Sequence, residues 1–202
     1  MIALFFEVTP RPGEDQRYLE IAGGLRPELE RSGGCAFLDR YRSLTRPRTM
    51  LSHQLWTDEA SLARWRANQR HYGAQTAGRA QVFEDYRLRV GPVLAHAGAD
   101  APLVEYDPGL TYNDPQRRPE RWMVVVRSRD APFGGEGESY RSVYLETDYA
   151  HVAPVAGRAN GIALLQRAMA DPCTRVAQLC LVSRDYGLHD RHEAPQYFPA
   201  RA

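Results

Sequence analysis

The feature that most constrains the fold is the stretch from residue 49 to residue 90, where a strand pattern, a helix pattern and a second strand pattern follow one another closely. Residues 49–56 form a short strand-like run that stops at Thr57-Asp58-Glu59, a hydroxyl and two acids of the kind that begin helices. Gly78 is predicted to end the helix, and residues 82–90 alternate as in a strand. Four residues spaced three or four apart are predicted to share one helix face: Leu62, Trp65, Gln69 and Tyr72.

The residues before this stretch carry the same kind of pattern. Residues 2–9 alternate as a strand, and apolar positions from Glu14 onward follow helical spacing, with Pro27 predicted to kink or split the helix. Gly33-Gly34 ends that helix, and residues 35–43 form a strand joined by a hairpin loop to the next one. The order over residues 2–90 is therefore β-α-β-β-α-β, the split βαβ arrangement, in which an antiparallel sheet carries two helices on one face and leaves the other face bare.

A bare sheet face lined by aromatic residues needs a cover, because burying apolar area is worth about 25 cal/mol per Å². Either a twin chain or the second half of this chain can supply a facing sheet. Since the two halves differ in pattern, we expect a homodimer.

The second half repeats the theme in shorter form. Residues 93–120 are rich in proline and glycine and are predicted to be a linker. A strand from Trp122, a strand over residues 140–146, a helix opened by Pro154 and a strand over residues 176–183 give β-β-α-β. We therefore predict an α+β chain with a ferredoxin-like domain at residues 1–92, a second, degenerate ferredoxin-like domain at residues 121–184, and an extended arm at residues 185–202 anchored by Tyr197 and Phe198.

Composition narrows the classes of partner and compartment. The 26 basic and 25 acidic residues give a net charge of +1, which provides no field to attract nucleic acid or anionic lipid. No leader-like segment or spanning apolar run is present, so we expect no membrane association and a cytoplasmic location. Three cysteines, Cys35, Cys173 and Cys180, lack metal-binding spacing and fit buried thiols in a reducing compartment.

The tail carries a weak candidate for a metal site. Its acidic and imidazole side chains could form a cluster, but their spacing is not that of a known site, and we predict no metal. These residues are His189, Asp190, His192 and Glu193.

Several residues around the second helix resemble the antibiotic biosynthesis monooxygenase family of dimeric α+β barrel proteins. They are Trp56, Trp65, His71, Gln75, Gly78-Arg79 and the closing run at residues 86–90. The resemblance covers about residues 1–95 and implies two ferredoxin-like sheets face to face, with a pocket between a sheet and its helices. Some members of that family oxygenate phenolic polyketides or quinols with dioxygen and without flavin, metal or haem.

The match departs from the phenol-oxygenating members at two positions. In those members an asparagine lies four residues before the strand-end tryptophan, and a tyrosine follows in the helix. Here Trp56 matches the tryptophan, whereas Ser52 occupies the asparagine position and Leu62 lies near the tyrosine position.

The match to the haem-cleaving members also departs at two positions. Trp65 matches their helix tryptophan, but Gln75 occupies the place of their histidine and Phe6 that of their first-strand asparagine. We therefore do not expect haem degradation. The resemblance instead implies that these residues, together with Trp56 and Ser52, contact an organic substrate.

Cofactor-free oxygenation needs a substrate that donates an electron to dioxygen, usually a phenolate or an enolate, so the protein must remove a proton and hold an anion. His71 suits the role of base, and Arg87 or Arg79 could hold the anion. Tyr72 and Tyr86 could orient a ring through their hydroxyls. The site predicted from the sequence thus has His71, Arg87 and Tyr72 in catalytic roles, with dioxygen as co-substrate and no cofactor.

Structural roles explain the same residues without chemistry. His71 follows an arginine in a polar run and could be a solvated or capping histidine, and Arg87 could pair with an acidic neighbour. Trp56 and Trp65 could be plain core, and His53 is predicted to be a hydrogen-bonded core residue. Two functions therefore remain open: a cofactor-independent monooxygenase of an electron-rich aromatic, polyketide or quinol, and a non-catalytic barrel that binds a small hydrophobic ligand or serves in assembly.

Overall fold

The computed structural model describes residues 1–107 and 120–195 of the 202-residue chain. The elements of the first half are β1 (Ile2–Pro10), α1 (Asp15–Gly24), α2 (Arg26–Ser32), β2 (Cys35–Ser43), β3 (Met50–Trp56), α3 (Glu59–Ala67), α4 (Gln69–Ala77), the π-helical turn η1 (Gly78–Val82) and β4 (Phe83–Gly98). Those of the second half are β5 (Ala101–Glu105), β6 (Trp122–Arg129), β7 (Glu138–Ser142), β8 (Asp148–Val155), α5 (Arg158–Met169), β9 (Thr174–Leu181) and β10 (Arg184–Gly187). The anchoring residues predicted for the arm, Tyr197 and Phe198, lie outside the described residues.

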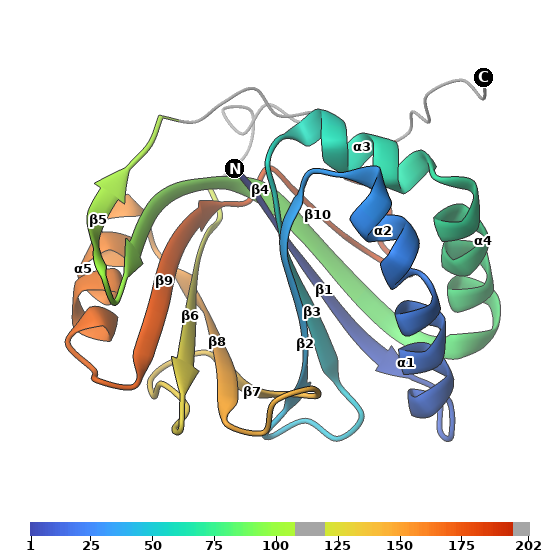
Figure 1. Cartoon of the computed structure of the whole chain (residues 1–202), viewed down its shortest axis with the longest axis horizontal. Coiled ribbons are helices and arrows are strands. Elements are labelled where there is room, and N and C mark those ends of the chain that lie inside the picture. The colour runs from blue at the N-terminus through green and yellow to red at the C-terminus, as the bar shows by residue number, and fades with distance from the viewer. Residues whose placement is uncertain (108–119, 196–202) are drawn as a thin grey trace.

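The first half has the predicted ferredoxin-like fold. Its strands are antiparallel in the order β2-β3-β1-β4, so the first strand lies between the third and the fourth. Helices α1 to α4 all cover one face of this sheet (Figure 1). The proline predicted to kink or split the first helix does split it: α1 ends at Gly24, and Pro27 lies in the first turn of α2, where its missing N–H costs nothing.

The second predicted helix is also broken, which the sequence pattern did not indicate. Asn68 has extended backbone angles between α3 and α4, and its side chain accepts a hydrogen bond from the backbone N–H of His71, at 3.0 Å. Because this local cap competes with a continuous helix, the axis changes direction there. Leu62 and Trp65 are buried while Gln69 is exposed, so the predicted common face over residues 62–72 was wrong.

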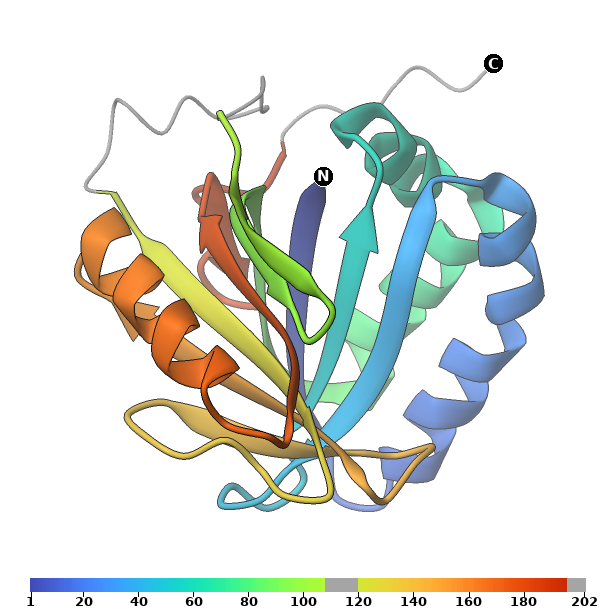
Figure 2. The ribbon, with the colours of Figure 1, turned by 60° about the vertical axis from the view of Figure 1, so that its left-hand side comes forward.

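The second half has the same strand order as the first, β7-β8-β6-β9, with a loop in place of the first helix. Its helix α5 covers the outer face of this second sheet, on the opposite side of the molecule from α1 to α4 (Figure 2). The predicted order β-β-α-β missed strand β8. Pro154 pairs with Met123 near the end of that strand, where proline is tolerated, and the helix begins only at Arg158.

The predicted linker at residues 93–120 is partly strand. Strand β4 continues to Gly98, pairing with β1 through Pro92 and with β9 from Val93 onward, and β5 pairs with β4. Gly91 lies at this change of partner, where a Cβ atom would come within 1.9 Å of the Leu181 carbonyl oxygen, so only glycine fits. One strand therefore belongs to both sheets. The remaining linker residues, 108–119, lie outside the described residues.

The two sheets close into one barrel within a single chain. At the edge opposite β4, strand β2 pairs with β7 through Tyr41 and Ser142, and β1 pairs with β4. The face without helices is thus covered by the second half of the chain, the alternative to a twin chain. A second chain is therefore not needed to cover this face, and homodimerisation stays a prediction. The interior holds a hydrophobic cluster, with buried polar residues such as His53 and Gln178 among it: Ala3, Phe5, Tyr41, Leu51, Leu55, Val93, Met123, Val125, Tyr140, Ala150, Val152, Cys180 and Val182.

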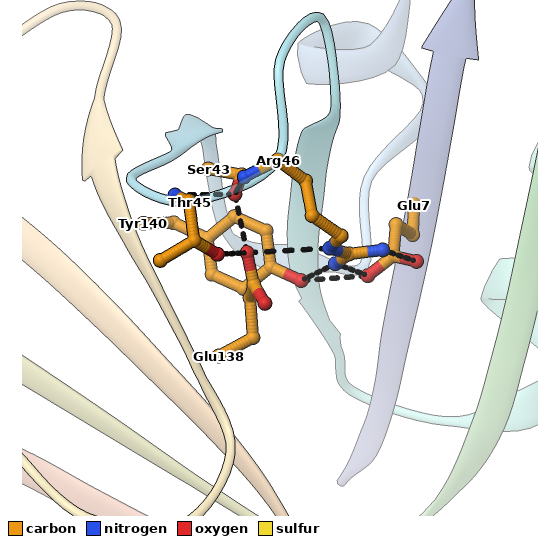
Figure 3. A network of polar contacts seen from close by, with 6 residues as sticks. All are labelled: Glu7, Ser43, Thr45, Arg46, Glu138 and Tyr140. Atoms are coloured by element: carbon orange, nitrogen blue, oxygen red, sulfur yellow. Dashed lines mark hydrogen bonds and ion pairs between the residues drawn. The ribbon is translucent and has the colours of Figure 1, made fainter.

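A polar network joins the two halves beside the β2–β7 seam (Figure 3). The Arg46 guanidinium binds both carboxylate oxygens of Glu7, at 3.0 and 2.8 Å, and donates to the Tyr140 hydroxyl, at 2.9 Å. Tyr140 in turn donates to Glu7, at 2.6 Å, and Glu138 pairs with Arg46, at 3.3 Å. Although burial raises the pKa of Glu7, these hydrogen bonds hold it below its ordinary value, so the ionised carboxylate helps to fasten the two sheets.

Candidate functional site

A cavity of about 410 Å³ lies between the helix-covered face of the first sheet and helices α3 and α4. Strand alternation explains its floor, because every second residue of β1, β3, β4 and β10 points to this face. The floor residues are Leu4, Phe6, Gln54, Tyr86, Leu88, Val90, Arg184 and Tyr186, and the roof residues are Leu62, Ala63, Trp65, Arg66, His71, Gln75 and Arg79. The resemblance implied a pocket in this position.

The C-terminal segment completes the wall of this cavity. Strand β10 pairs with β4, and residues 191–195 follow it along the opening. Asp185, on the opposite face of β10, holds the segment in place: its two oxygens accept hydrogen bonds from Arg87 at 2.8 and 2.7 Å. Glu193 accepts from the Asp185 N–H, at 2.7 Å, and from Arg121, at 2.6 Å. The fold thus brings residues from both ends of the chain to one site.

Arg87 therefore does not have the position that its predicted role requires. It lies on the face of β4 away from the cavity and pairs with Asp185, the acidic-neighbour alternative. Tyr72 is half-buried on α4 and does not line the cavity either, because the break at Asn68 turns α4 relative to α3. Of the three residues predicted to be catalytic, His71 alone lines the cavity.

The orientation of His71 is fixed by two contacts. Its ring stacks on Trp65, with centroids 4.5 Å apart and planes 16° apart, and its Nδ1 lies 2.9 Å from the Trp65 carbonyl oxygen. Because a carbonyl oxygen only accepts hydrogen bonds, this contact places the imidazole proton on Nδ1 and the lone pair on Nε2. Burial lowers the pKa of His71 to about 4, so the ring is neutral near pH 7. Its Nε2 is thus an acceptor, with no hydrogen-bond partner in the described parts of the chain.

A second, smaller cavity of about 110 Å³ adjoins the first beneath α1 and α2. The two cavities share six lining residues: Phe6, Gln54, Trp65, His71, Gln75 and Phe83. Ser52 lines only the smaller one. The Gln75 amide nitrogen lies 3.0 Å from the His71 Nδ1, beside the ring at the boundary between the two spaces.

Trp56 has a supporting position. It is fully buried and lines neither cavity, so it is core, as the structural alternative predicted. Its indole N–H donates to the Gln54 amide oxygen, at 3.0 Å, and the Gln54 amide nitrogen donates to Ser52, at 3.2 Å. Gln54 thereby presents a fixed polar group to both cavities. Gln54 was not among the site residues predicted from the sequence, although its alternation with Ser52 and Trp56 was a signal that could have identified it.

The cavity is rich in guanidinium groups. Arg66, Arg79, Arg184 and Arg191 line it, against one carboxylate, Glu193, which is already paired with Arg121, while Arg184 is itself paired with Glu59. Arg191 donates to the Tyr86 hydroxyl, at 2.6 Å, and Arg79 makes no ion pair with any residue in the described ranges. Arg66 and Arg191 both lie against the Tyr186 ring, with guanidinium carbons 5.9 and 5.8 Å from its centroid. An otherwise apolar space with this charge favours a ligand that carries an anionic group.

The described residues include no group of three or more histidine, cysteine, aspartate or glutamate side chains that could hold a metal ion. Of the tail residues considered for such a cluster, His192 lines the cavity and Glu193 is held by Arg121. Cys35, Cys173 and Cys180 are free thiols, and only Cys180 is fully buried. No helix in residues 1–107 and 120–195 has both the length and the apolar character needed to cross a membrane.

Comparison with known proteins gives consistent matches. The family model described as antibiotic biosynthesis monooxygenase matches residues 1–77. A curated protein of Pyricularia oryzae (strain 70-15 / ATCC MYA-4617 / FGSC 8958), named Jasmonate monooxygenase ABM, is 35% identical over 213 residues, covering 98% of this chain and 99% of that protein.

Two solved structures are similar over nearly the whole chain. An anthrone oxidase-like protein has 10% identity and a TM-score of 0.42, covering 96% of this chain and 95% of its own. A candidate monooxygenase of Lactobacillus acidophilus NCFM has 5% identity and a TM-score of 0.44, covering 90% of this chain and 92% of its own.

Proposed function

Because the chain belongs to the antibiotic biosynthesis monooxygenase family, we propose that it oxygenates a small organic molecule bound in the larger cavity, with dioxygen as the oxidant and without a bound flavin, metal or haem. The observation that carries this proposal is the position of His71: a neutral imidazole whose Nε2 lone pair is available at an apolar cavity. A pocket that reaches His71 is also the feature that separates the enzymatic function from a barrel packed solid with tryptophan.

The first step is removal of a proton from the substrate by His71 Nε2. The stack on Trp65 and the bond to its carbonyl oxygen keep the ring in one tautomer, so no reorientation is needed before the transfer. An imidazole with a pKa of about 4 in the empty cavity is a weak base. The anion formed beside it stabilises the imidazolium, and this pairing supplies the missing basicity.

The second stage uses the electrons of that anion. The deprotonated carbon centre transfers one electron to dioxygen, and the resulting radical and superoxide combine to form a carbon–oxygen bond. The peroxide anion takes back a proton from the His71 imidazolium, and loss of water leaves a carbonyl group. In sum, a CH₂ group and O₂ give C=O and H₂O, so no external reductant is consumed.

Electron-rich aromatic, polyketide-like and quinol-type molecules meet this requirement where their phenolate delocalises its charge onto a ring carbon that carries hydrogen. A second substrate class is favoured by the cavity arginines and by the whole-length relative, whose name states that it acts on jasmonate. Jasmonate is a carboxylate that also carries a ring ketone, and an enolate of that ketone is an electron donor of the same type. Arg79 and Arg191 would bind the carboxylate, since neither has a carboxylate partner among the described residues.

Oxygen uptake tests the proposal. Purified protein treated with a chelator is assayed with anthrones, hydroquinones and jasmonate, and product is identified by mass after incubation with ¹⁸O₂. His71→Ala is expected to lower kcat/KM by 10²- to 10⁴-fold, the usual contribution of a general base, whereas His189→Ala, which removes an exposed tail histidine, leaves it unchanged. Arg191→Met separates the substrate classes, because it raises KM for the carboxylate and not for its methyl ester.

Tight binding of a panel member without oxygen uptake would support the remaining alternative, a ligand-binding barrel. Full activity of the His71→Ala variant would refute the assignment of the base.

A further inference from the structure

We propose that the smaller cavity beneath α1 and α2 is a dioxygen site, in which the guanidinium of Arg40 stabilises the superoxide formed when the substrate anion gives up its first electron. This inference rests on the proposed function, because it assigns a place to the co-substrate of that reaction. It starts from a buried charge that the mechanism above does not use.

Arg40 is a cation in an unusual environment. It lies on β2, only 7% exposed, and lines the smaller cavity but not the larger one. Its Nη1 donates to the Tyr144 hydroxyl, at 2.9 Å, and the neutral Tyr18 hydroxyl is a second polar neighbour, while its buried Nε has no hydrogen-bond partner. Arg40 forms no ion pair with any carboxylate in the described ranges. A buried cation without a counter-charge is costly, so a site that keeps one is a candidate for holding an anion during function.

The rest of the cavity suits an apolar gas. Its lining is mostly carbon, from α1, α2 and the strands beneath them, with residues such as Ile21, Ala22, Leu25 and Leu29. A volume of about 110 Å³ exceeds the space needed for one water-sized molecule, yet it is about a quarter of the neighbouring cavity. Dioxygen is small and apolar before it is reduced and anionic afterwards. An apolar chamber with one uncompensated cation matches both states.

The position relative to the base is also suitable. His71, Trp65 and Gln75 belong to the walls of both cavities, so a gas molecule in the smaller one lies next to the boundary where the substrate loses its proton. The electron then travels from the substrate anion to dioxygen across that boundary. The negative charge that appears on oxygen is stabilised by Arg40, while the substrate becomes a neutral radical beside the His71 imidazolium, and the two radicals can combine in place.

Steady-state kinetics at varied oxygen concentration test this assignment. Arg40→Met is expected to lower kcat/KM for dioxygen at least tenfold, with less than a twofold change in the Kd of the organic substrate measured without oxygen. Arg40→Lys, which keeps the charge, recovers part of the loss. Arg42→Met is the matched control, because Arg42 is an exposed arginine on the same strand that lies 3.7 Å from Asp15.

Two further measurements test the inference without changing Arg40, the second of them on the wild-type protein. Ala74 lines only the smaller cavity, so Ala74→Leu should raise KM for dioxygen without weakening substrate binding. In xenon-pressurised crystals of the wild-type protein, a xenon atom is expected beneath α1 and α2.

The outcomes separate the two proposals. Weakened substrate binding with unchanged oxygen dependence in Arg40→Met, or a smaller cavity that admits no xenon, would overturn the dioxygen site and leave the monooxygenase proposal standing. A wild-type protein that consumes no oxygen with any substrate, yet binds xenon there, would instead show that the proposed function itself is wrong, and the dioxygen role would be lost with it.

Discussion

Acidification should destabilise this protein through one residue in particular, His53. It is fully buried in the barrel, stacks on Phe5 with ring centroids 4.8 Å apart, and has an Nε2 atom with no hydrogen-bond partner. Burial, with a smaller contribution from Arg127, lowers the pKa of His53 from 6.5 to about 3. The unfolded chain therefore takes up a proton on this ring at a higher pH than the folded protein does.

The size of the effect follows from these two pKa values. His53 contributes its full stabilisation above about pH 6.5, and the contribution is lost as the pH falls from 6.5 toward 3. Between pH 7 and pH 5 the loss is about 2 kcal/mol, since each unit over which only the unfolded chain is protonated costs about 1.4 kcal/mol. The variant His53→Gln, which cannot titrate, should lack this part of the pH dependence whatever its stability at pH 7.

Urea unfolding followed by tryptophan fluorescence measures this difference. The free energy of unfolding is determined at pH 7 and pH 5 for the wild type, for His53→Gln and for the surface control His189→Gln. We expect the wild type and the control to lose about 2 kcal/mol more than His53→Gln on acidification. Equal losses in all three proteins would refute the reasoning, because they would mean that His53 is protonated at the same pH in the folded and unfolded chains.

Three further predictions test the architecture. Gly91→Ala should destabilise the protein by at least about 3 kcal/mol, because its Cβ would clash with a backbone carbonyl. Gly73→Ala, on the exposed side of α4, should instead stabilise it by about 0.5 kcal/mol, and urea unfolding measures both changes. Asp185→Asn should speed hydrogen exchange in residues 184–195 and weaken ligand binding about tenfold, because it removes a charge that holds the cavity wall; unchanged exchange would contradict this anchoring role. Glu7→Gln should lower the free energy of unfolding by about 1 kcal/mol at pH 7, a modest value because the partner Arg46 is 45% exposed. This loss should shrink as the pH falls through the lowered pKa of Glu7, and urea unfolding of both proteins at pH 7 and pH 4 measures it.

Much of the first half was predictable because its signals are local. Alternation set the strands, the Thr57-Asp58-Glu59 triplet placed a helix start, and Pro27 marked a break, each through interactions within a few residues. The failures were local as well: in the first half the Asn68 side chain caps α4 and stops a helix whose apolar spacing continues, and in the second half Pro154 lies near the end of a strand rather than at the start of a helix.

The site was predicted only in part, since its residues come from distant segments. His71, Trp65, Gln75, Phe6 and Tyr86 line the larger cavity as expected, because they lie on elements whose faces the local pattern indicates. The C-terminal wall was not foreseen. Its residues meet β4 across about half the chain, as in the hydrogen bond between Arg191 and Tyr86, 105 positions apart.

By itself, the sequence determined the four strands of the amino-terminal half, the helical segments between them and their order, since periodicity and capping depend on neighbours along the chain. The tertiary structure alone decided that β4 serves both sheets, that the barrel closes within one chain, and that Arg40, Arg79 and Arg191 face cavities while Arg87 does not. Cross-strand register and cavity shape arise from contacts between residues far apart in the chain, and no local pattern encodes them.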